Sequence, residues 1–353
     1  MKKTLTRILT LTLAVLLALS LFACAKTDDK GDATNDASTT NAPDNTAAPA
    51  PEAEPDSNLE IKVYALNGTT ALGMAQLMSR QKAGTTGMNY NISTHAAADA
   101  ITGAIISGEC AIAALPTNVA VKLYHKSNGK LQLLALNTLG VLYLLTPDGE
   151  NITSLDQLSG KTIYLPGAGS NPEYITSALL SSAGVKEYHL DTTSFPSPDA
   201  LVAAVAAGKA QYAVLPEPKV SAATAQNSSI KVALDLTAEW EKLNGEGTLV
   251  QGCLVVNTAF AKAHPTEIAR FLSDYEQSVN FIREGSDEAI SMIVDAKIIP
   301  AAPIAKKALP KCNICFIAGA DMKPLMNTFC EKIFAADNSS IGKMPDDGFY
   351  YVG

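Results

Sequence analysis

The sequence lacks the short motifs that support most hydrolytic and nucleotide-dependent chemistry. It contains no GxSxG, no HExxH and no glycine-rich loop that ends in Gly-Lys-Ser/Thr. Its four histidines each stand alone, without a motif around them: His95, His125, His189 and His264. Catalysis is therefore not the function that the sequence favours.

Positive charge is also scarce. The chain has 27 Lys and Arg against 35 Asp and Glu, and its formal net charge is −8. No basic stripe interleaved with aromatic residues occurs, and nucleic-acid binding normally needs one. We therefore expect no nucleic acid among the partners.

Cysteines are few, and those outside the first 24 residues are odd in number. They are Cys110, Cys253, Cys312, Cys315 and Cys330, which cannot all pair with one another. Cys312 and Cys315 have the CxxC spacing of zinc and redox sites, but no second CxxC or histidine pair completes a ligand set. We expect these thiols to serve packing, with metal or redox use as the alternative, and we predict no metal and no cofactor.

The first 23 residues have the organisation of an export signal. Basic residues within the first seven positions precede an apolar segment, residues 8–19, that is short for a membrane span. Cys24 directly follows the small residue Ala23, and this junction resembles the lipobox of bacterial lipoproteins. The pattern predicts a signal peptide over residues 1–23 and lipidation of Cys24, with a plain secretory signal as the alternative.

The segment after the cysteine is unsuited to a folded core. Residues 25–58 contain no aromatic residue and no leucine, isoleucine or valine, and Asp, Asn, Thr, Ala and Pro dominate. Such a segment cannot bury enough apolar surface to offset its loss of conformational entropy. We predict that residues 24–58 form a tether between the membrane and a folded body from Leu59 to Gly353.

That body contains an internal repeat with a period of one hundred residues. The segment Asp99–Gly108 resembles Asp199–Gly208, and Ala113–Pro116 resembles Ala213–Pro216. Several matches in one register indicate two similar units in tandem. The alternative is that two alanine- and glycine-rich segments resemble each other by chance.

Each unit alternates expected strands with expected helices. Apolar runs at residues 61–66 and 162–165 each lead through a glycine turn into a helix, at about residues 70–82 and 172–182. Alternation at this spacing is typical of parallel βαβ units with helices on the faces of the sheet. The sequence therefore predicts two α/β lobes, with a ligand in the crevice at the carboxyl ends of their strands.

Three stretches carry a resemblance to a known family. They are Leu155–Tyr164 (LDQLSGKTIY), Gly208–Pro218 (GKAQYAVLPEP) and His264–Phe271 (HPTEIARF). With these stretches the chain resembles bacterial ABC-transporter substrate-binding lipoproteins of the nitrate, sulfonate and taurine or thiamine-precursor kind. The resemblance implies a two-lobed periplasmic-binding-protein-like fold of type II, with mostly parallel sheets and a cleft between the lobes.

The resemblance also implies a domain division and partners. The chain would cross between lobes near residues 139–147 and 248–256. Residues 59–146 with 250–353 would form the first lobe, and residues 147–249 the second. The expected partners are a small-molecule ligand, an ABC permease and, through the lipid, the extracytoplasmic face of the membrane. We expect a monomer that closes about the two crossings.

Candidate ligand-binding residues lie in turns after the expected strands and on the return crossing. They are Asn67, Gly68, Thr69, Thr70, Thr117, Asn118, Gly169, Ser170, Asn171, Glu217 and Gln251. Backbone N–H groups at helix starts, with hydroxyls and amides beside them, can bind an anion or a carbonyl oxygen. Alternatives remain open for three of them: Thr70 and Asn171 can be helix caps, and Glu217 a surface acid at a helix start.

The scarcity of arginine bears on the ligand. Beyond residue 23 only Arg80, Arg270 and Arg283 occur, and none lies in a candidate turn. Strong anions usually recruit a guanidinium group. We therefore expect a neutral or singly charged small organic molecule. Two alternatives to a transport function stay open, a pyrimidine-precursor or related enzyme on the same fold and a ligand-sensing surface lipoprotein without a transporter.

Overall fold

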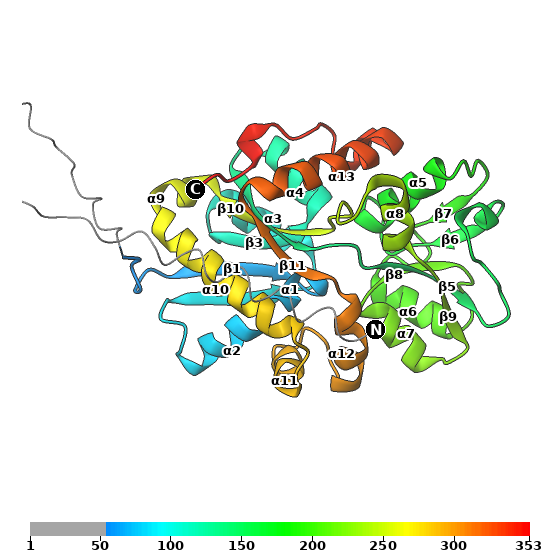
Figure 1. Cartoon of the computed structure of the whole chain (residues 1–353), viewed down its shortest axis with the longest axis horizontal. Coiled ribbons are helices and arrows are strands. Elements are labelled where there is room, and N and C mark those ends of the chain that lie inside the picture. Colours follow the sequence, from blue (N-terminus) through cyan, green and yellow to red (C-terminus); the bar gives the residue numbers. More distant parts are fainter. Residues whose placement is uncertain (1–53) are drawn as a thin grey trace, which may run out of the picture. The chain divides into compact units, whose positions relative to one another are not determined.

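Two β-sheets organise the part of the chain that the structure, a computed structural model, describes, which is residues 54–353 (Figure 1). The predicted signal peptide, the predicted lipidation site Cys24 and nearly all of the predicted tether lie outside the described residues. No helix among residues 54–353 combines the length and the apolar character that a bilayer crossing needs.

The first sheet has six strands, in the order β11-β4-β10-β3-β1-β2. Its strands are β1 (Ile61–Leu66), β2 (Tyr90–His95), β3 (Ile112–Pro116), β4 (Leu131–Thr138), β10 (Gly252–Asn257) and β11 (Ile314–Ala318). β1 pairs in parallel with β2 and β3, whereas β10 runs antiparallel to β3 and β4. The sheet is therefore mixed, with the strand of the return crossing at its centre.

The second sheet has five strands, in the order β7-β6-β8-β5-β9. Its strands are β5 (Leu142–Pro147), β6 (Thr162–Tyr164), β7 (His189–Asp191), β8 (Ala213–Pro216) and β9 (Ile230–Asp235). β6 is parallel to β7 and β8, and β5 is antiparallel to β8 and β9. Strands β6 to β9 take the places of β1 to β4, with β5 in the place of β10, which agrees with the hundred-residue repeat.

Helices flank both sheets. With the first sheet are α1 (Thr69–Leu72), α2 (Ala75–Ala83), α3 (Ala98–Ser107), α4 (Thr117–Lys126), α9 (Thr258–Ala263), α10 (Pro265–Arg283), α11 (Asp287–Asp295), α12 (Ala302–Ala308) and α13 (Met322–Ala336). With the second are α5 (Asn171–Ser182), α6 (Pro198–Ala206), α7 (Lys219–Gln226) and α8 (Leu236–Asn244). Short 3₁₀ turns lie at Leu155–Leu158, Leu309–Lys311, Gly319–Asp321, Asn338–Ser340 and Asp347–Phe349.

The helix expected over residues 70–82 is divided into α1 and α2. Gly73 lies at the break, where α10 packs closely against the chain. A Cβ on Gly73 would lie 2.5 Å from Tyr275 Oη and 2.8 Å from Val279 Cγ2. Only glycine fits at this position, because α10, which is about two hundred residues away in the sequence, leaves no space for a side chain.

The chain passes between the sheets twice, at residues 139–141 and 245–251. The predicted division at residue 146 assigned β5 to the first lobe, and the strand pairing corrects this, because β5 pairs with β8 and β9. The apolar sequence of β5 is compatible with either sheet. Only the strands with which it pairs determine the sheet to which it belongs. The first crossing turns at Gly140, where a Cβ would collide with Thr237 and Leu249.

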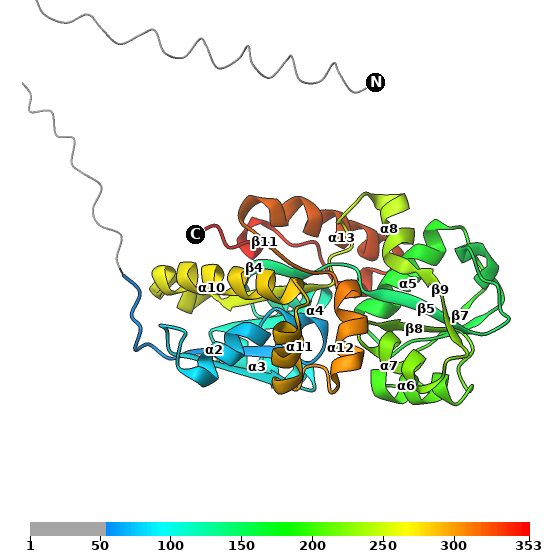
Figure 2. The same ribbon diagram turned by 60° about the horizontal axis from the view of Figure 1, so that its bottom comes forward.

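One apolar core extends through both lobes. Helix α13 follows the last strand of the first sheet yet packs against α5 of the second lobe (Figure 2). Phe329 on α13 lies against Trp240 on α8, with ring centroids 5.8 Å apart. The C-terminal helix therefore joins the two lobes on the side away from α12.

Candidate ligand-binding site

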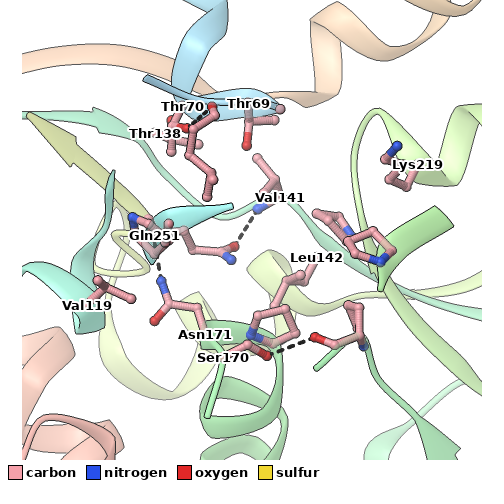
Figure 3. A pocket seen from close by; sticks show the side chains of 18 of the residues that line it. Thr69, Thr70, Val119, Thr138, Val141, Leu142, Ser170, Asn171, Lys219 and Gln251 are labelled. Atoms are coloured by element: carbon pink, nitrogen blue, oxygen red, sulfur yellow. Dashed lines mark hydrogen bonds between the residues drawn. The ribbon is translucent and has the colours of Figure 1, made fainter. Parts of the chain in front are cut away.

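A cavity of about 360 Å³ lies between the lobes (Figure 3). Its wall is formed by turns that follow strands of both sheets, by the starts of helices α4 to α7 and by the two crossings. It is lined by residues 66–70, Ala98, Pro116, Asn118, Val119, Thr138, Val141, Leu142, Pro166, residues 168–172, Pro198, residues 216–219 and Gln251. Ten of the eleven candidate residues line it, and Thr117 does not.

The turn after β1 forms one wall of the cavity. Gly68 has φ +119°, a backbone conformation that residues with a Cβ rarely adopt. Thr70 Oγ1 donates to the carbonyl oxygen of Leu66 at 2.8 Å, and Asn137 Nδ2 donates to the carbonyl oxygen of Thr70 at 3.1 Å. The Thr70 side chain therefore holds the turn against the strand, and it caps no helix.

β10 allows this turn to approach closely because it begins with glycine. A Cβ on Gly252 would lie 2.7 Å from Asn137 Oδ1 and 2.8 Å from Thr70 Cγ2. A side chain at Gly252 would therefore displace the turn that lines the cavity.

Two asparagines, at the starts of α4 and α5, line the cavity. Asn118 Nδ2 donates to the carbonyl oxygen of Gly169 at 3.2 Å, so it connects the first lobe to the glycine turn of the second. Asn171 Nδ2 donates to the carbonyl oxygen of Gln251 at 2.9 Å and to Thr117 Oγ1 at 3.2 Å. Neither residue caps its helix, so the cap interpretation of Asn171 is wrong.

Thr117 supports the site from behind its wall. It is fully buried, and its Oγ1 donates to the carbonyl oxygen of Val250 at 2.8 Å while accepting from Asn171. The structure therefore shows Thr117 as a residue that positions Asn171 and the return crossing, and not as part of the cavity surface.

Gln251 connects the two crossings. Its Oε1 accepts a hydrogen bond from the Val141 backbone N–H at 2.7 Å. The side chain extends between Val141 and Asn171, and its amide group lies at the cavity wall (Figure 3). Since the N–H donor fixes the orientation of the amide, Nε2 is the group that remains for a ligand.

Glu217 is not a surface acid. Only 1% of the residue is exposed, and its two carboxylate oxygens accept hydrogen bonds from Ser221 N and Ser221 Oγ, both at 3.0 Å. Burial raises the pKa of Glu217, and the bonds from Ser221 oppose that shift only in part. From a buried position, the Glu217 side chain thus accepts a hydrogen bond from a backbone N–H in the first turn of α7.

Among residues 54–353, Lys219 is the one cationic side chain that lines the cavity, and it is not among the residues predicted from the sequence. Its Nζ forms an ion pair with Asp199 in the first turn of α6. Lys219 lies two residues after Glu217 at the first position of α7, so the rule that selected Glu217 could have found it. No aromatic residue lines the cavity within the part of the chain that the structure describes.

The residues considered for catalysis or metal binding lie elsewhere. None of the four histidines lines the cavity. Cys110, Cys253, Cys312, Cys315 and Cys330 are buried and free, and within residues 54–353 no group of three His, Cys, Asp or Glu side chains could hold a metal ion. Cys312 and Cys330 pack in separate apolar clusters.

The two-lobed fold with an interlobe cavity is that of the periplasmic binding proteins. A family model described as ABC transporter, phosphonate, periplasmic substrate-binding protein matches residues 73–299, and the chain belongs to this family. This agrees with the resemblance found in the sequence. The protein is thus an extracytoplasmic substrate-binding component of an ABC importer, and its family consists of binding proteins. A search of curated proteins finds no match.

Solved structures show the same fold at low sequence identity. An ABC transporter protein from Parabacteroides distasonis is 23% identical, with a TM-score of 0.69, and the match covers 82% of this chain and 98% of that one. The periplasmic aliphatic sulphonate binding protein SsuA from Escherichia coli is 15% identical, with a TM-score of 0.66 and coverage of 80% and 89%. The alkanesulfonate-binding protein SsuA from Xanthomonas axonopodis pv. citri, bound to MOPS, is 14% identical, with a TM-score of 0.61 and coverage of 80% and 94%.

Proposed function

We propose that this protein captures a small organic molecule in the interlobe cavity and delivers it to its permease without changing it chemically. The observation that carries the proposal is the meeting of polar groups from both lobes and both crossings in one cavity, with Asn118 and Asn171 on its wall. The candidate residues Asn67, Gly68, Thr69, Thr70, Asn118, Gly169, Ser170, Asn171, Glu217 and Gln251 would contact the ligand, and Thr117 would support them.

Capture would proceed by closure about the crossings. The bond from Val141 N–H to Gln251 Oε1 joins the two crossing segments to each other, so they can bend as one unit. The bonds from Asn118 to Gly169 and from Asn171 to Gln251 lie on the cavity side of that hinge. These contacts join the two lobes beside the cavity and would hold them together around a bound ligand.

Within the described residues, the ionisable side chains on the cavity wall are engaged by other side chains, which supports binding without catalysis. Of the ionisable side chains on its wall, Glu217 is engaged by Ser221 and Lys219 by Asp199. Among the described residues, the one hydroxyl that bonds either group is Ser221 Oγ, and Ser221 does not line the cavity. A general acid–base mechanism needs such a pair within hydrogen-bond reach of the substrate.

We further propose that residues 1–23 direct export, that lipidated Cys24 anchors the chain to the membrane, and that residues up to 58 act as the tether of a monomer. The first lobe would comprise residues 59–138 with 252–353, and the second residues 142–244. Replacing Cys24 with alanine should release the protein from the membrane fraction while leaving its ligand affinity unchanged. Retention of the variant in the membrane fraction would contradict the anchor.

Native mass spectrometry tests the capture function directly. Protein purified from its own host should carry a small molecule that is released on unfolding and recovered with its mass unchanged after incubation. Re-addition of the recovered molecule to stripped protein should reduce the radius of gyration measured by X-ray scattering and raise the melting temperature. Chemical conversion of the molecule would support an enzyme, and an unchanged radius at saturation would contradict hinge closure.

A further inference from the structure

Two buried acceptors at the cavity have no hydrogen-bond partner. Asn118 is fully buried and Asn171 is 4% exposed, and the Oδ1 atom of each is unpaired. Their orientations are fixed, because each Nδ2 donates to a backbone carbonyl oxygen, which can only accept. An unpaired buried oxygen is destabilising, so a molecule that donates hydrogen bonds is the natural complement of this wall.

Glu217 contributes a buried carboxylate to the same cavity wall. Glu217 uses one acceptor site on each oxygen for Ser221, and an ionised carboxylate offers about four. Lys307 and Lys311 lie near enough to lower the pKa of Glu217, yet within the described residues no cationic nitrogen comes within ion-pair distance of it. Lys307 Nζ instead donates to Thr224 Oγ1 at 2.8 Å.

The electrostatics of the second lobe disfavour an anion in the cavity. Each of its three helices that begin there has an acid in or before its first turn: Glu173 on α5, Asp199 on α6 and Glu217 before α7. Glu173 Oε2 also accepts from the Gly169 N–H at 2.5 Å, so that donor is already occupied. These acids offset the positive potential that would otherwise bind an oxyanion. Lys219, the remaining cation, is neutralised by Asp199.

Resting on the proposed function, we propose that the ligand is a small aliphatic molecule recognised through a protonated amine, with Glu217 as its counter-charge and the Asn118 and Asn171 Oδ1 atoms as acceptors. Val119, Val141 and Leu142 offer apolar contact to its carbon skeleton (Figure 3). Gln251 Nε2 gives one donor for an oxygen on the same molecule. Phosphonates and sulfonates without an amine are not its ligands.

A matched set of probes tests this proposal. Butylamine, butyramide, butylphosphonate and butanesulfonate share one carbon skeleton, and each can be titrated into the stripped protein at constant ionic strength while the melting temperature and the affinity are measured. Butylamine should give the largest rise in melting temperature. A larger rise with butylphosphonate or butanesulfonate would overturn the ammonium assignment while leaving capture in the cavity intact.

Variants connect the result to the residues. Glu217→Gln keeps the shape and an acceptor for Ser221 and removes the charge, so butylamine should bind about tenfold or more weakly. Glu187→Gln makes the same change of charge in the same lobe, at an exposed position outside the cavity wall, and should alter the affinity far less. Equal effects of the two variants would overturn the role of Glu217.

A second variant, Lys219→Met, tests the proposal even if Glu217→Gln fails to fold. Lys219→Met removes the cation at a partly exposed position, where the Lys219 side chain is 31% exposed. Lys219→Met should leave the affinity for butylamine unchanged or increase it. If the cavity were an oxyanion site, the same variant would bind butylphosphonate and butanesulfonate more weakly. Weaker butylamine binding would overturn the proposal. No response to any probe, together with no co-purified molecule, would overturn the capture function as well.

Discussion

Asn171 Nδ2 lies 2.9 Å from the carbonyl oxygen of Gln251, and this bond attaches the start of α5 in the second lobe to the crossing that returns the chain to the first sheet. The same nitrogen donates to Thr117 Oγ1 at 3.2 Å. One side chain therefore joins the second lobe to a helix start of the first lobe and to the return crossing.

Replacing Asn171 with alanine should lower the free energy of unfolding by about 1 kcal/mol, since two buried hydrogen bonds are lost and an unpaired oxygen is removed with them. Urea unfolding measures this change. Asn91→Ala is the control, because Asn91 bonds Glu60 in an exposed position on β2 and should leave stability nearly unchanged. Equal losses in the two variants would contradict the bridging role of Asn171.

Trp240 should report closure of the lobes. It is the one tryptophan in the chain, it is 1% exposed, and its Nε1 donates to Thr248 Oγ1 at 3.0 Å in the second crossing. Because Trp240 also packs against Phe329 of α13, movement of the crossing changes the surroundings of its indole ring. Ligand that reduces the radius of gyration should therefore shift its fluorescence emission.

Two variants separate this signal from other effects. Trp240→Phe should abolish the emission, and Thr248→Val should shift the emission of the free protein because the indole N–H loses its acceptor. Constant emission from the unaltered protein under conditions that produce closure by scattering would show that the second crossing does not move.

Features set by local sequence were predictable. Gly68 and Gly169 mark turns that follow β1 and β6, because a positive φ favours glycine. Polar residues beside such turns lie at the cleft, because parallel strands end at the same edge of a sheet. For this reason the candidate turns and Gln251 converge on one cavity. The burial of Glu217 was not predictable, because residues distant in the sequence, such as Lys307 and Lys311, lie close to it.

Features set by contacts between distant segments were not predictable. The sheet to which β5 belongs depends on β8 and β9, and the division between α1 and α2 depends on Tyr275. The pairing of Lys219 with Asp199 depends on how α6 packs against α7. Each of these needs the three-dimensional neighbour, which no pattern within one segment contains.

The five cysteines of the described residues should react only when the protein unfolds. All are buried and free, and burial raises the pKa of Cys110, Cys315 and Cys330 to about 12. Thiol reagents attack the thiolate, which is scarce at neutral pH under these conditions. Ellman's reagent should therefore label these thiols slowly in buffer and fully in guanidinium chloride.

Mass spectrometry with and without reductant gives the control. The mass of the chain from residue 54 onward should not change on reduction, since no two of these cysteines are bonded. A gain of two hydrogens after reduction would reveal a disulfide that contradicts this arrangement. Rapid labelling in buffer would instead indicate an exposed or activated thiol.

The raised pKa of Glu217 should make the free energy of unfolding of the protein depend on pH. Burial raises its pKa in the folded state, while Ser221, Lys311 and Lys307 favour the ionised form. Tyr143 and Cys312 lie near it and stay neutral, because burial, and to a lesser degree the nearby carboxylate, raises the pKa of both. Of these groups, Glu217 is therefore the one whose titration, shifted upward by burial, contributes to the pH dependence of stability.

The sign follows from proton binding. Between the unfolded pKa of a glutamic acid, about 4.3, and the higher folded pKa, the folded protein holds more protons than the unfolded chain. The contribution of Glu217 to the free energy of unfolding therefore rises as the pH falls through the folded pKa, and it is lost as the pH rises again. Glu217→Gln removes this contribution and has no charge to titrate.

Urea unfolding of both proteins over this range measures the effect as a difference. The free energy of unfolding of the unaltered protein, relative to Glu217→Gln, should increase as the pH is lowered from neutral toward 4.3. Ligand with a protonated amine should reduce the slope, because it stabilises the ionised carboxylate in the folded state. Parallel pH profiles without ligand would mean that water reaches Glu217 and its pKa is not raised.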